Sequence, residues 1–431
     1  MKPTAEYQPR HAMSSRPLRI LLLNQAFHPD HVATALVLSD FALALVARGH
    51  AVTAVASSRG YDSATVRYPS TEEWRGVKIR RIWTPGLGKT RKWRRLVDFA
   101  AFWISATWLL LRLPRFDVTV CLTSPPLIST LGTLMAKIKG GKVIPWIMDL
   151  NPDEAVAAGW LRAGSAPERI MTVLQNWSFS QAARIIVLDR FMAERLKAKK
   201  VPPDIIHVDA PWSHDQTVRH DLEARKQYRG QHRLDGKFVV MYSGNHSPCH
   251  PLDTVLAAAE ALTGDAQIHF LFVGGGSEFA KVTAFARQKS LTNVTTLPYE
   301  PVEKLSGSLS SADLHLVVMG DAFVGIVHPC KIYNILSLGI PFLFIGPAES
   351  HVGDLAGRLN QPDYARMIRH GDVEALCRAI RQAATQGWPS RNEGARSLAV
   401  HFSQDNICPR LMKLVEDSAA RRRDRCSQQS C

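Results

Sequence analysis

The sequence predicts an α/β protein with two Rossmann-like, doubly wound domains that face a cleft. Short apolar runs rich in β-branched residues alternate with helical patterns, and such strands are typical of parallel sheets covered on both faces. The alternation stops in a polar connector, residues 207–236, and then starts again. The chain has 431 residues. That length suits two domains of about 200 residues each.

The first domain is expected over residues 18–208. A helical pattern covers residues 35–48 and ends before Gly49. Strands joined by such helices form a parallel, doubly wound sheet. The predicted strands are 18–24, 51–57, 77–83, 117–123, 142–148 and 184–189.

The second domain is expected over residues 237–400, and residues 401–431 are expected to form a helix and a basic disordered tail. Open parallel sheets bind ligands beyond the carboxyl ends of their strands, so the loops there are the first places to search for a site. The predicted strands are 237–244, 268–276, 293–298, 313–320 and 340–346, and the predicted helices are 252–262, 278–288 and 329–338.

Composition narrows the class of protein. The apolar fraction of 46% excludes a disordered chain. Seven cysteines without a C-x-x-C pair favour a reducing, cytoplasmic setting. Residues 1–16 lack the apolar stretch of a signal peptide, and the longest uncharged apolar run, residues 99–111, is shorter than the about 18–20 residues of a membrane span.

The net charge of +15 is concentrated between residues 75 and 95, where nine basic residues and no acidic residue occur. An apolar segment with Trp103 and Trp108 follows directly. This order suits a helix that lies in the interface of an anionic membrane. The alternative is a core helix beside a solvated basic loop. A nucleic-acid binder would also be basic, but no nucleic-acid motif is present. The basic residues are 75, 78, 80, 81, 89, 91, 92, 94 and 95.

Polar residues at two strand ends of the first domain are candidates for acceptor contacts. The loop after the first strand carries Gln25, Phe27, Pro29 and Asp30, and the alternative for this loop is a plain connecting turn. The segment after the fifth strand carries Asp149, Asp153 and Glu154, three carboxylates that suit acid/base or hydroxyl-binding roles. Its alternative role is N-capping of a helix by Asn151 or Asp153.

Three segments of the second domain are candidates for anion binding. The turn after strand 237–244 contains Gly244, Asn245, His246 and His250, and its H-x-x-C-H order does not match usual zinc spacings. A glycine-rich turn includes Gly275 and Gly276. Lys331 falls in the first turn of a helix, where a cation opposes the helix dipole unless an anion binds beside it.

The ordered motifs resemble a known family. Residues 25–57, SPP at 124–126, MDLNPDE at 148–154, YSGNH at 242–246, FVGGG at 272–276, HPCKIYN at 328–334 and G-x-P at 339–341 are similar to family 4 glycosyltransferases, in the subgroup of colanic-acid and O-antigen type enzymes. The resemblance spans about residues 18–400 and implies the GT-B fold. It also implies retaining transfer from a nucleotide-sugar donor, bound in the second domain, to an acceptor bound in the first, without a required metal or cofactor.

The resemblance also implies a role for each site residue. Catalysis would use Asp149, Lys331 and His246. The acceptor would contact Gln25, Phe27, Pro29, Asp30 and Glu154, with a lipid-linked or oligosaccharide acceptor expected in cell-surface polysaccharide synthesis. The diphosphate would lie over Gly325, Ile326 and Val327, the sugar against Phe323 and Val324, and the base near Leu297, Pro298 and Tyr299. The remaining donor contacts would be Gly244, Asn245, His250, Gly275, Gly276 and Asn334.

Two departures from the family pattern keep alternatives open. Ile326 and Asn334 stand where many relatives have glutamates. Asn245 and His250 stand where many have Arg and Lys, so His246, His250 and Lys331 would have to bind the diphosphate. A nucleotide-sugar epimerase of the same fold and a catalytically silent sugar-binding relative therefore remain alternatives. No nucleic-acid partner is expected. The protein is expected at the inner face of the cell membrane, as a peripheral protein.

Overall fold

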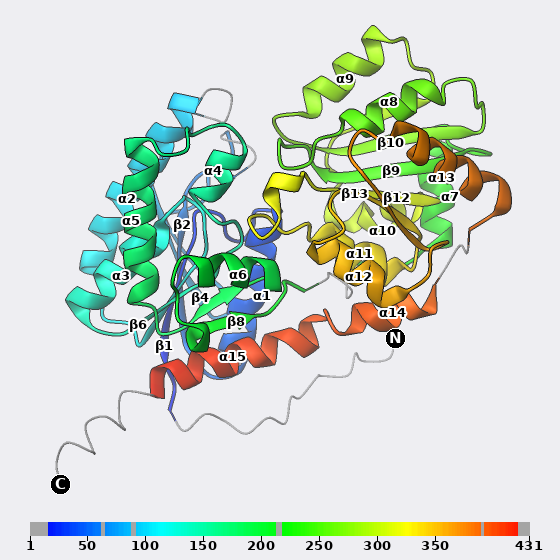
Figure 1. The fold of residues 1–431 in the computed structure, drawn as a ribbon. Coiled ribbons are helices and arrows are strands. Elements are labelled where there is room, and N and C mark those ends of the chain that lie inside the picture. The colour runs from blue at the N-terminus through cyan, green and yellow to red at the C-terminus, as the bar shows by residue number, and fades with distance from the viewer. Residues whose placement is uncertain (1–15, 62–64, 88–91, 213–217, 389–391, 421–431) are drawn as a thin grey trace, which may run out of the picture. The chain divides into compact units, whose positions relative to one another are not determined.

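The structure, a computed structural model, describes residues 16–61, 65–87, 92–212, 218–388 and 392–420. The chain forms two compact units (Figure 1). Unit 1 comprises residues 1–88, 93–144 and 411–431, and unit 2 comprises residues 89–92 and 145–410. The predicted domain limits at residues 208, 237 and 400 stay predictions.

Unit 1 contains a six-stranded sheet in the order β3-β4-β2-β1-β5-β6. The pairs β1–β2, β1–β5 and β2–β4 are parallel, as predicted, whereas β3 is antiparallel to β4. Strand β3 was not predicted because two of the four residues of its sequence, TEEW, are acidic and it has no continuous apolar run. The strands are β1 (Arg19–Leu23), β2 (Ala51–Ser57), β3 (Thr71–Trp74), β4 (Val77–Ile82), β5 (Val118–Cys121) and β6 (Lys142–Pro145).

Helices α1 (Ala33–Ala47), α2 (Lys92–Arg112) and α3 (Ile128–Lys139) belong to unit 1. Phe102, Ala106 and Leu110 of α2 pack with α3 against one face of the sheet. The 21 residues of α2 include charged residues, and none of the helices in the described ranges is long and apolar enough to cross a membrane.

The first part of unit 2 is a small α/β segment after β6. Strand β7 (Ile185–Val187) pairs in parallel with β8 (Ile206–Val208), and Ile186 also forms an isolated bridge with Trp146. The predicted strand 184–189 therefore exists, but it pairs mainly with β8 rather than extending the first sheet. The helices of this segment are α4 (Asp153–Ala157), α5 (Ala166–Ser180) and α6 (Arg190–Ala198).

The second part of unit 2 holds an all-parallel sheet in the order β11-β10-β9-β12-β13-β14. Its edge strand β14 was not predicted, because ARMI is a short and mixed run. The strands are β9 (Phe238–Asn245), β10 (Ile268–Gly275), β11 (Val294–Leu297), β12 (Leu314–Val318), β13 (Phe342–Ile345) and β14 (Ala365–Ile368).

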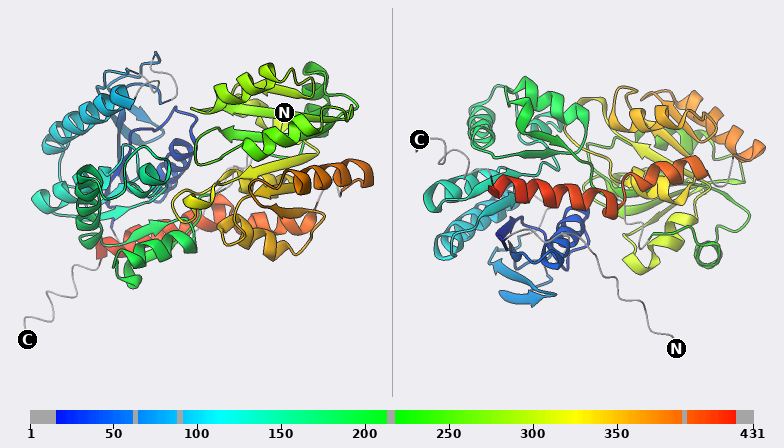
Figure 2. Two further views of the ribbon diagram at one scale, coloured as in Figure 1. Left: turned by 45° about the horizontal axis from the view of Figure 1, so that its top comes forward. Right: turned by 90° about the horizontal axis from the view of Figure 1, so that it is seen from below.

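Alternate residues of these strands belong to apolar clusters on opposite faces of the sheet, and helices cover both faces (Figure 2). One face packs against α8 (Asp253–Ala261), α9 (Phe279–Gln288) and α13 (Val373–Gln386). The other packs against α7 (Leu222–Gln231), α10 (Leu305–Ser310), α11 (Lys331–Leu338) and α12 (His351–Leu359). Helices α14 (Glu393–Val400) and α15 (Gln404–Ala420) follow, and the predicted tail, 421–431, lies outside the described residues.

Candidate active site

The carboxyl end of β9 lies directly beside the first residue of α11. Gly244 has φ +132°, and a Cβ placed on it would lie 3.2 Å from Nζ of Lys331. A Cβ on Gly274 of β10 would lie 2.0 Å from the carbonyl oxygen of Gly244. Both glycines are thus required for the close approach of β9, β10 and the lysine, as expected where a backbone must approach a ligand.

The side-chain amine of Lys331, at the start of α11, is a buried ionisable group beside this turn. Its Nζ is buried, has no hydrogen-bond partner within the described residues, and lies 3.4 Å from the centroid of the Tyr242 ring. Burial lowers the pKa of Lys331 well below its usual value. The ring compensates only part of the desolvation, because a cation–π contact is worth about 1–2 kcal/mol. A bound anion would stabilise the protonated, positively charged form of Lys331.

Three histidines surround this lysine, and burial is the main cause of their low pKa values. The pKa of His246 falls to about 4, that of His250 to about 3 and that of His315 to about 4. Lys331 lowers each of them further. His246 donates through Nδ1 to the carbonyl oxygen of Gly244 at 3.0 Å, and its Nε2 is buried without a partner in the part of the chain that is described.

Stability should fall in acid because of these histidines. An unfolded histidine has a pKa near 6.5, so between pH 6.5 and about 4 the unfolded state binds more protons than the folded state. The free energy of unfolding should therefore decrease as the pH falls through this range, by on the order of 3 kcal/mol for His246 alone. Urea unfolding at pH 7 and pH 5 should show this slope, and His246→Gln should flatten it. An equal slope in the variant would contradict the assignment.

The loop between β12 and α11 is held by residues of the 145–208 segment. The backbone N–H of Leu150 donates to the carbonyl oxygen of Ile326 at 2.9 Å, and Nε of Arg195 donates to that of Val324 at 2.6 Å. Gly325 has φ +69°, and a Cβ there would lie 2.6 Å from the carbonyl oxygen of Phe191. The loop thus has one tightly specified shape.

The predicted donor residues of this loop differ in accessibility. The side chains of Phe323 and Ile326 are buried in apolar clusters, and the N–H groups of Ile326 and Val327 both donate to the carbonyl oxygen of Phe323. Val324 and Val327 are half-buried. The burial of Ile326 accounts for one departure from the family pattern, because a glutamate carboxylate at this position would be buried among apolar side chains.

Asp149 lies next to this loop, since its neighbour Leu150 bonds to Ile326. Its charge raises the pKa of Cys330, a shift caused first by burial. Glu154 accepts a hydrogen bond from Nδ2 of Asn151 at 2.9 Å. Asp153 forms an ion pair with Lys199 at 2.8 Å, and the side chain of neither Asn151 nor Asp153 N-caps α4. Asp149 and Glu154 thus remain the candidates, while Asp153 is structural.

The predicted acceptor residues of unit 1 lie at the end of β1. Gln25 accepts a hydrogen bond from Oγ of Ser124 at 3.2 Å, and Pro29 is half-buried. Phe27 is buried and packs edge-on against Trp74. Asp30 is buried and accepts hydrogen bonds from the N–H of Tyr61 and the hydroxyl of Tyr68. Asp30 and Phe27 therefore shape the loop, as its plain-turn alternative implies.

The remaining donor candidates lie around β10 and β11. Tyr299 is 52% exposed, and a Cβ on Gly275 would lie 2.9 Å from its ring. Gly276 has φ +122° and faces the backbone of His246, Pro298 and Asn245 are exposed, and Asn334 is half-buried one turn after Lys331. An exposed ring beside a glycine-rich strand end can stack on a base.

Sequence reasoning missed a group of four polar side chains at the other side of α11, of which three are buried and His351 is half-buried. Asp189, His328, Tyr333 and His351 are joined by hydrogen bonds, and ligand atoms of Asp189, His328 and His351 lie within 4.8 Å of one another. His328 and Tyr333 belong to the quoted HPCKIYN motif, and Asp189 follows a strand directly before a helix. The capping position of Asp189 was the one available signal.

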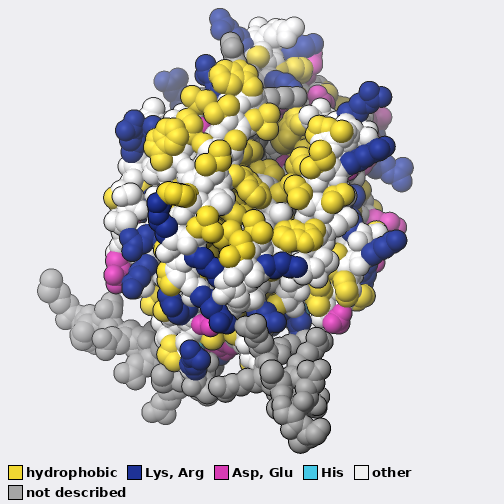
Figure 3. Space-filling view, turned by 90° about the vertical axis from the view of Figure 1, so that its left-hand side faces the viewer, with side chains coloured by type: hydrophobic (Ala, Val, Ile, Leu, Met, Phe, Trp, Pro, Cys, Tyr) yellow, Lys and Arg dark blue, Asp and Glu magenta, His cyan; other side chains and the backbone are white. Residues whose placement is uncertain are grey.

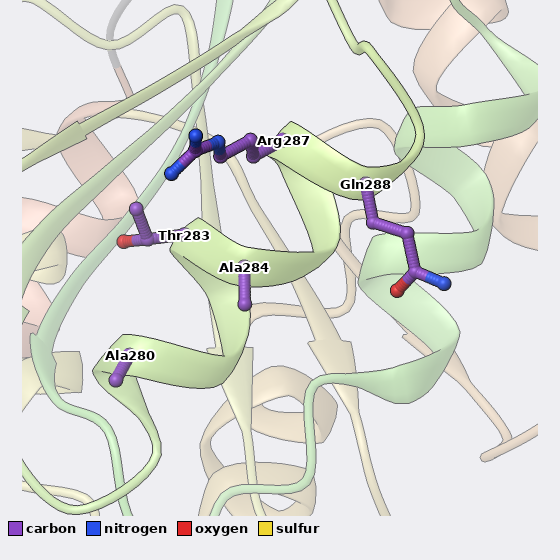
Figure 4. Close-up of a pocket in the computed structure, with 5 residues that line it drawn as sticks. All are labelled: Ala280, Thr283, Ala284, Arg287 and Gln288. Carbon is purple, nitrogen blue, oxygen red and sulfur yellow. The ribbon is translucent and has the colours of Figure 1, made fainter.

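A hollow of about 820 Å³ on α9 is a separate feature. Figure 4 shows Thr283 and Arg287 extending from the same side of the helix, whereas Gln288 lies on the other. Its lining comes from one helix and includes none of the residues predicted for the site. Because active sites combine groups from several elements, the turn around Lys331 is the better candidate.

Comparisons with protein families and with known sequences find similarity to glycosyltransferases. Residues 33–212 match the model of the glycosyl transferase 4-like domain. The putative colanic acid biosynthesis glycosyl transferase WcaI of Escherichia coli K12 is 26% identical over 414 residues, which cover 93% of this chain and 99% of WcaI.

Solved structures show the same fold at low identity. Sucrose-phosphate synthase from Thermosynechococcus elongatus has a TM-score of 0.73 at 15% identity, over 93% of this chain and 99% of the synthase. HepE of Anabaena, solved with UDP and glucose, has a TM-score of 0.70 at 14% identity, over 93% of this chain and all 100% of HepE. Together with the two six-stranded sheets, these matches show the GT-B fold, with a glycosyl transferase 4-like domain over residues 33–212.

Proposed function

We propose that this glycosyltransferase binds the diphosphate of a nucleotide-sugar donor at Lys331. The observation that carries the proposal is the buried, unpartnered Nζ of Lys331, beneath a glycine turn and among neutral histidines. Burial of an amine without an anion is costly, and it is retained where binding supplies the charge. The UDP and glucose bound to HepE, a protein of the same fold, support a nucleotide-sugar as the donor.

The proposed reaction is transfer with retention at the anomeric carbon. A bond forms between the acceptor hydroxyl oxygen and the anomeric carbon as the bond between that carbon and the diphosphate breaks, and negative charge develops on the leaving phosphate. Lys331 and the Gly244–Asn245 turn would stabilise that charge electrostatically, and His246 would do so once the bound anion raises its pKa enough for Nε2 to take up a proton. The leaving phosphate can take the proton of the acceptor hydroxyl, so Asp149 would orient the acceptor or share that proton.

The acceptor is proposed to be a lipid-linked saccharide in cell-surface polysaccharide synthesis. WcaI, whose name refers to colanic acid, matches nearly the whole chain and supports this class of product. Asp149 and Glu154 would supply carboxylates for the acceptor hydroxyls, because Leu150 holds their segment next to the donor loop. Gln25 and Pro29, at the end of β1 in unit 1, stay predicted acceptor contacts.

Calorimetric titration with UDP-, GDP-, ADP- and dTDP-hexoses tests the donor. One of these should bind, and nucleotide release should then depend on added detergent-solubilised membrane lipid extract. Interconversion of the sugar without any transfer would favour the epimerase alternative, and binding without turnover would favour the silent relative. Absence of binding by all four classes would overturn the proposal.

We further propose that unit 1 places the enzyme on the cytoplasmic face of an anionic membrane. Figure 3 shows apolar side chains gathered on the face that carries α2 and α3, with lysines and arginines around them. On α2, Ile104 is 72% and Trp108 61% exposed, and the guanidinium of Arg112 lies 3.7 Å from the Trp108 ring centroid. Phe102 and Leu110 are buried, so α2 is both a core helix and a helix with an exposed apolar stripe.

The basic residues near α2 support an anionic partner. A hollow of about 200 Å³ is lined by Arg19, Lys78 and Arg80 together with Phe116. Lys89 and Arg91 of the predicted basic segment lie outside the described residues, and the side chains of Lys92 and Arg95 are not described. Each Lys or Arg near an anionic surface adds about 1 kcal/mol, screened by salt.

Replacing Ile104 and Trp108 by glutamate should weaken membrane binding about ten-fold or more, because two apolar anchors become charges. Flotation with vesicles that contain phosphatidylglycerol measures this. Leu222→Glu is the control, since Leu222 is 70% exposed but lies on α7 of unit 2. Equal flotation of the double variant and the wild type would rule out α2 as the contact.

A further inference from the structure

Asp189, His328, Tyr333 and His351 form one continuous chain of hydrogen bonds, here called the relay. Nδ1 of His328 lies 2.8 Å from Oδ2 of Asp189, Nε2 of His328 lies 2.6 Å from the Tyr333 hydroxyl, and that hydroxyl lies 2.8 Å from Nε2 of His351. Asp189, His328 and Tyr333 are buried. The ring centroids of His328 and His351 lie 4.1 Å apart, with the two imidazoles tilted by 38°.

With one proton on each imidazole, one direction of donation satisfies every atom of the relay. The carboxylate of Asp189 can only accept, so His328 carries its proton on Nδ1 and accepts through Nε2 from the Tyr333 hydroxyl. The oxygen of Tyr333 is then free to accept from Nε2–H of His351. Burial alone would raise the pKa of Asp189, but the hydrogen bond from His328 lowers it overall. The carboxylate therefore sets the tautomer of His328 and, through it, the orientation of the tyrosine.

The relay joins separate elements of unit 2. Asp189 N-caps α6 through Oδ1, which accepts from the N–H of Met192, and thus belongs to the 145–208 segment. His328 lies in the loop before α11, Tyr333 within α11, and His351 at the start of α12. The same segment also holds the loop at Val324, Gly325 and Ile326. The relay therefore adds to the contacts by which the 145–208 segment holds the loop between β12 and α11.

Lys331 and Tyr333 extend to different sides of α11. Residues two positions apart in an α-helix, such as these, are about 200° apart around the axis. Tyr333 accordingly reaches the relay, whereas Lys331 reaches Gly244 and the Tyr242 ring. Fixing Tyr333 from one side fixes the rotation of α11, and with it the position of the lysine on the other side.

We propose that Asp189, His328, Tyr333 and His351 are positioning residues that hold the loop 324–330 and the first turn of α11 in the geometry that binds the donor diphosphate. The inference rests on the proposed function of Lys331. None of the four is assigned a contact with substrate; they act through the loop and the helix. Satisfied networks of this kind make a single arrangement favourable in a low-dielectric interior.

The same cluster could be suspected of binding a metal ion, because two histidines and a carboxylate are common ligands. The hydroxyl of Tyr333 lies within hydrogen-bond distance of both imidazoles, and every bond has a donor and an acceptor with neutral histidines. A metal would have to break these bonds, so the geometry favours the relay.

Tyr333→Phe tests the inference because it removes only the central hydroxyl. Tyr364→Phe is the matched control: Tyr364 is fully buried in the same apolar cluster, and its hydroxyl has no hydrogen-bond partner within the described ranges. Amide hydrogen exchange of residues 324–331 should become about ten-fold faster in Tyr333→Phe and stay unchanged in Tyr364→Phe. The affinity for the tightest of UDP, GDP, ADP and dTDP should fall about ten-fold in Tyr333→Phe alone, a change of about 1.4 kcal/mol.

A double variant separates a connected relay from independent packing effects. Asp189→Asn keeps an N-capping side chain but removes the charge that orients His328. If the relay acts as a unit, Asp189→Asn with Tyr333→Phe costs no more affinity than the larger single change, whereas independent effects add.

Equal behaviour of Tyr333→Phe and Tyr364→Phe would overturn the inference, as would additive losses or a stoichiometric metal that Asp189→Asn releases. If the wild type binds none of the four diphosphates, the proposed function fails, and hydrogen exchange alone decides whether the relay holds the loop. If exchange quickens but affinity does not change, the positioning role fails while the donor assignment stands.

Discussion

Lys331→Met is expected to remove donor binding and, at the same time, to make the protein more stable. Methionine keeps the length and shape of the side chain but removes a buried amine that has no hydrogen-bond partner among the described residues. The lost charge should lower kcat/KM for the nucleotide-sugar by about 100-fold or more, because a preorganised cation faces the leaving phosphate. The gain in unfolding free energy should be about 1 kcal/mol.

The pH dependence of that gain has a defined sign. Burial lowers the pKa of Lys331 in the folded state, so between that pKa and the usual pKa of lysine the unfolded state binds more protons, and the wild type loses stability as the pH falls through this range. The difference between Lys331→Met and the wild type should therefore shrink as the pH rises toward 10. Titration calorimetry and urea unfolding measure both effects, and Lys226→Met, on the exposed surface of α7, is the control. A variant with normal affinity, or one that is destabilised, would refute the role of Lys331.

Asp149→Asn should leave donor affinity within about two-fold of the wild type and lower kcat by about 100-fold, because acid/base and orienting groups contribute on this scale. The amide can still donate to an acceptor hydroxyl but cannot accept its proton or stabilise positive charge on the sugar. Nucleotide release with saturating donor and lipid extract measures kcat, and binding calorimetry measures the donor separately.

Asp153→Asn is the matched control for this change. Asp153 lies in the same segment but forms an ion pair with Lys199, so its replacement should alter stability by about 1 kcal/mol or less and leave kcat unchanged. Equal kcat values for the two variants would show that Asp149 has no special role. A loss of donor affinity in Asp149→Asn would place the carboxylate at the donor instead of the acceptor.

The parallel architecture could be predicted from local pattern, because buried strands such as Leu21–Leu23 and Phe342–Ile345 are continuous apolar runs. Lys331 could also be found from local sequence, because a cation in the first turn of a predicted helix interacts unfavourably with the helix dipole. Such features depend on residues close together in the chain.

What could not be predicted depends on partners distant in sequence. The acidic strand β3 is specified by its pairing with β4, and β7 is placed by β8 rather than by its own apolar pattern. Asp30 had the polarity of a ligand contact, yet Tyr61 and Tyr68 use its carboxylate. The bond between Asp189 and His328 joins residues 139 positions apart, and no local periodicity reports on such a contact.

Helix α15 has a consequence for the order in which the protein folds. Its first residues belong to unit 2 and its last to unit 1, where Glu416 pairs with Arg48 at 2.9 Å and with His50 at 3.0 Å. Those partners are separated by 368 and 366 residues. A ribosome therefore delivers nearly all of unit 1 before unit 2, but it delivers the α15 residues that complete unit 1 only after residues 145–410. Unit 1 has an unfinished surface while those residues are synthesised, so a change that disrupts α15 would damage the part of the protein that is made first.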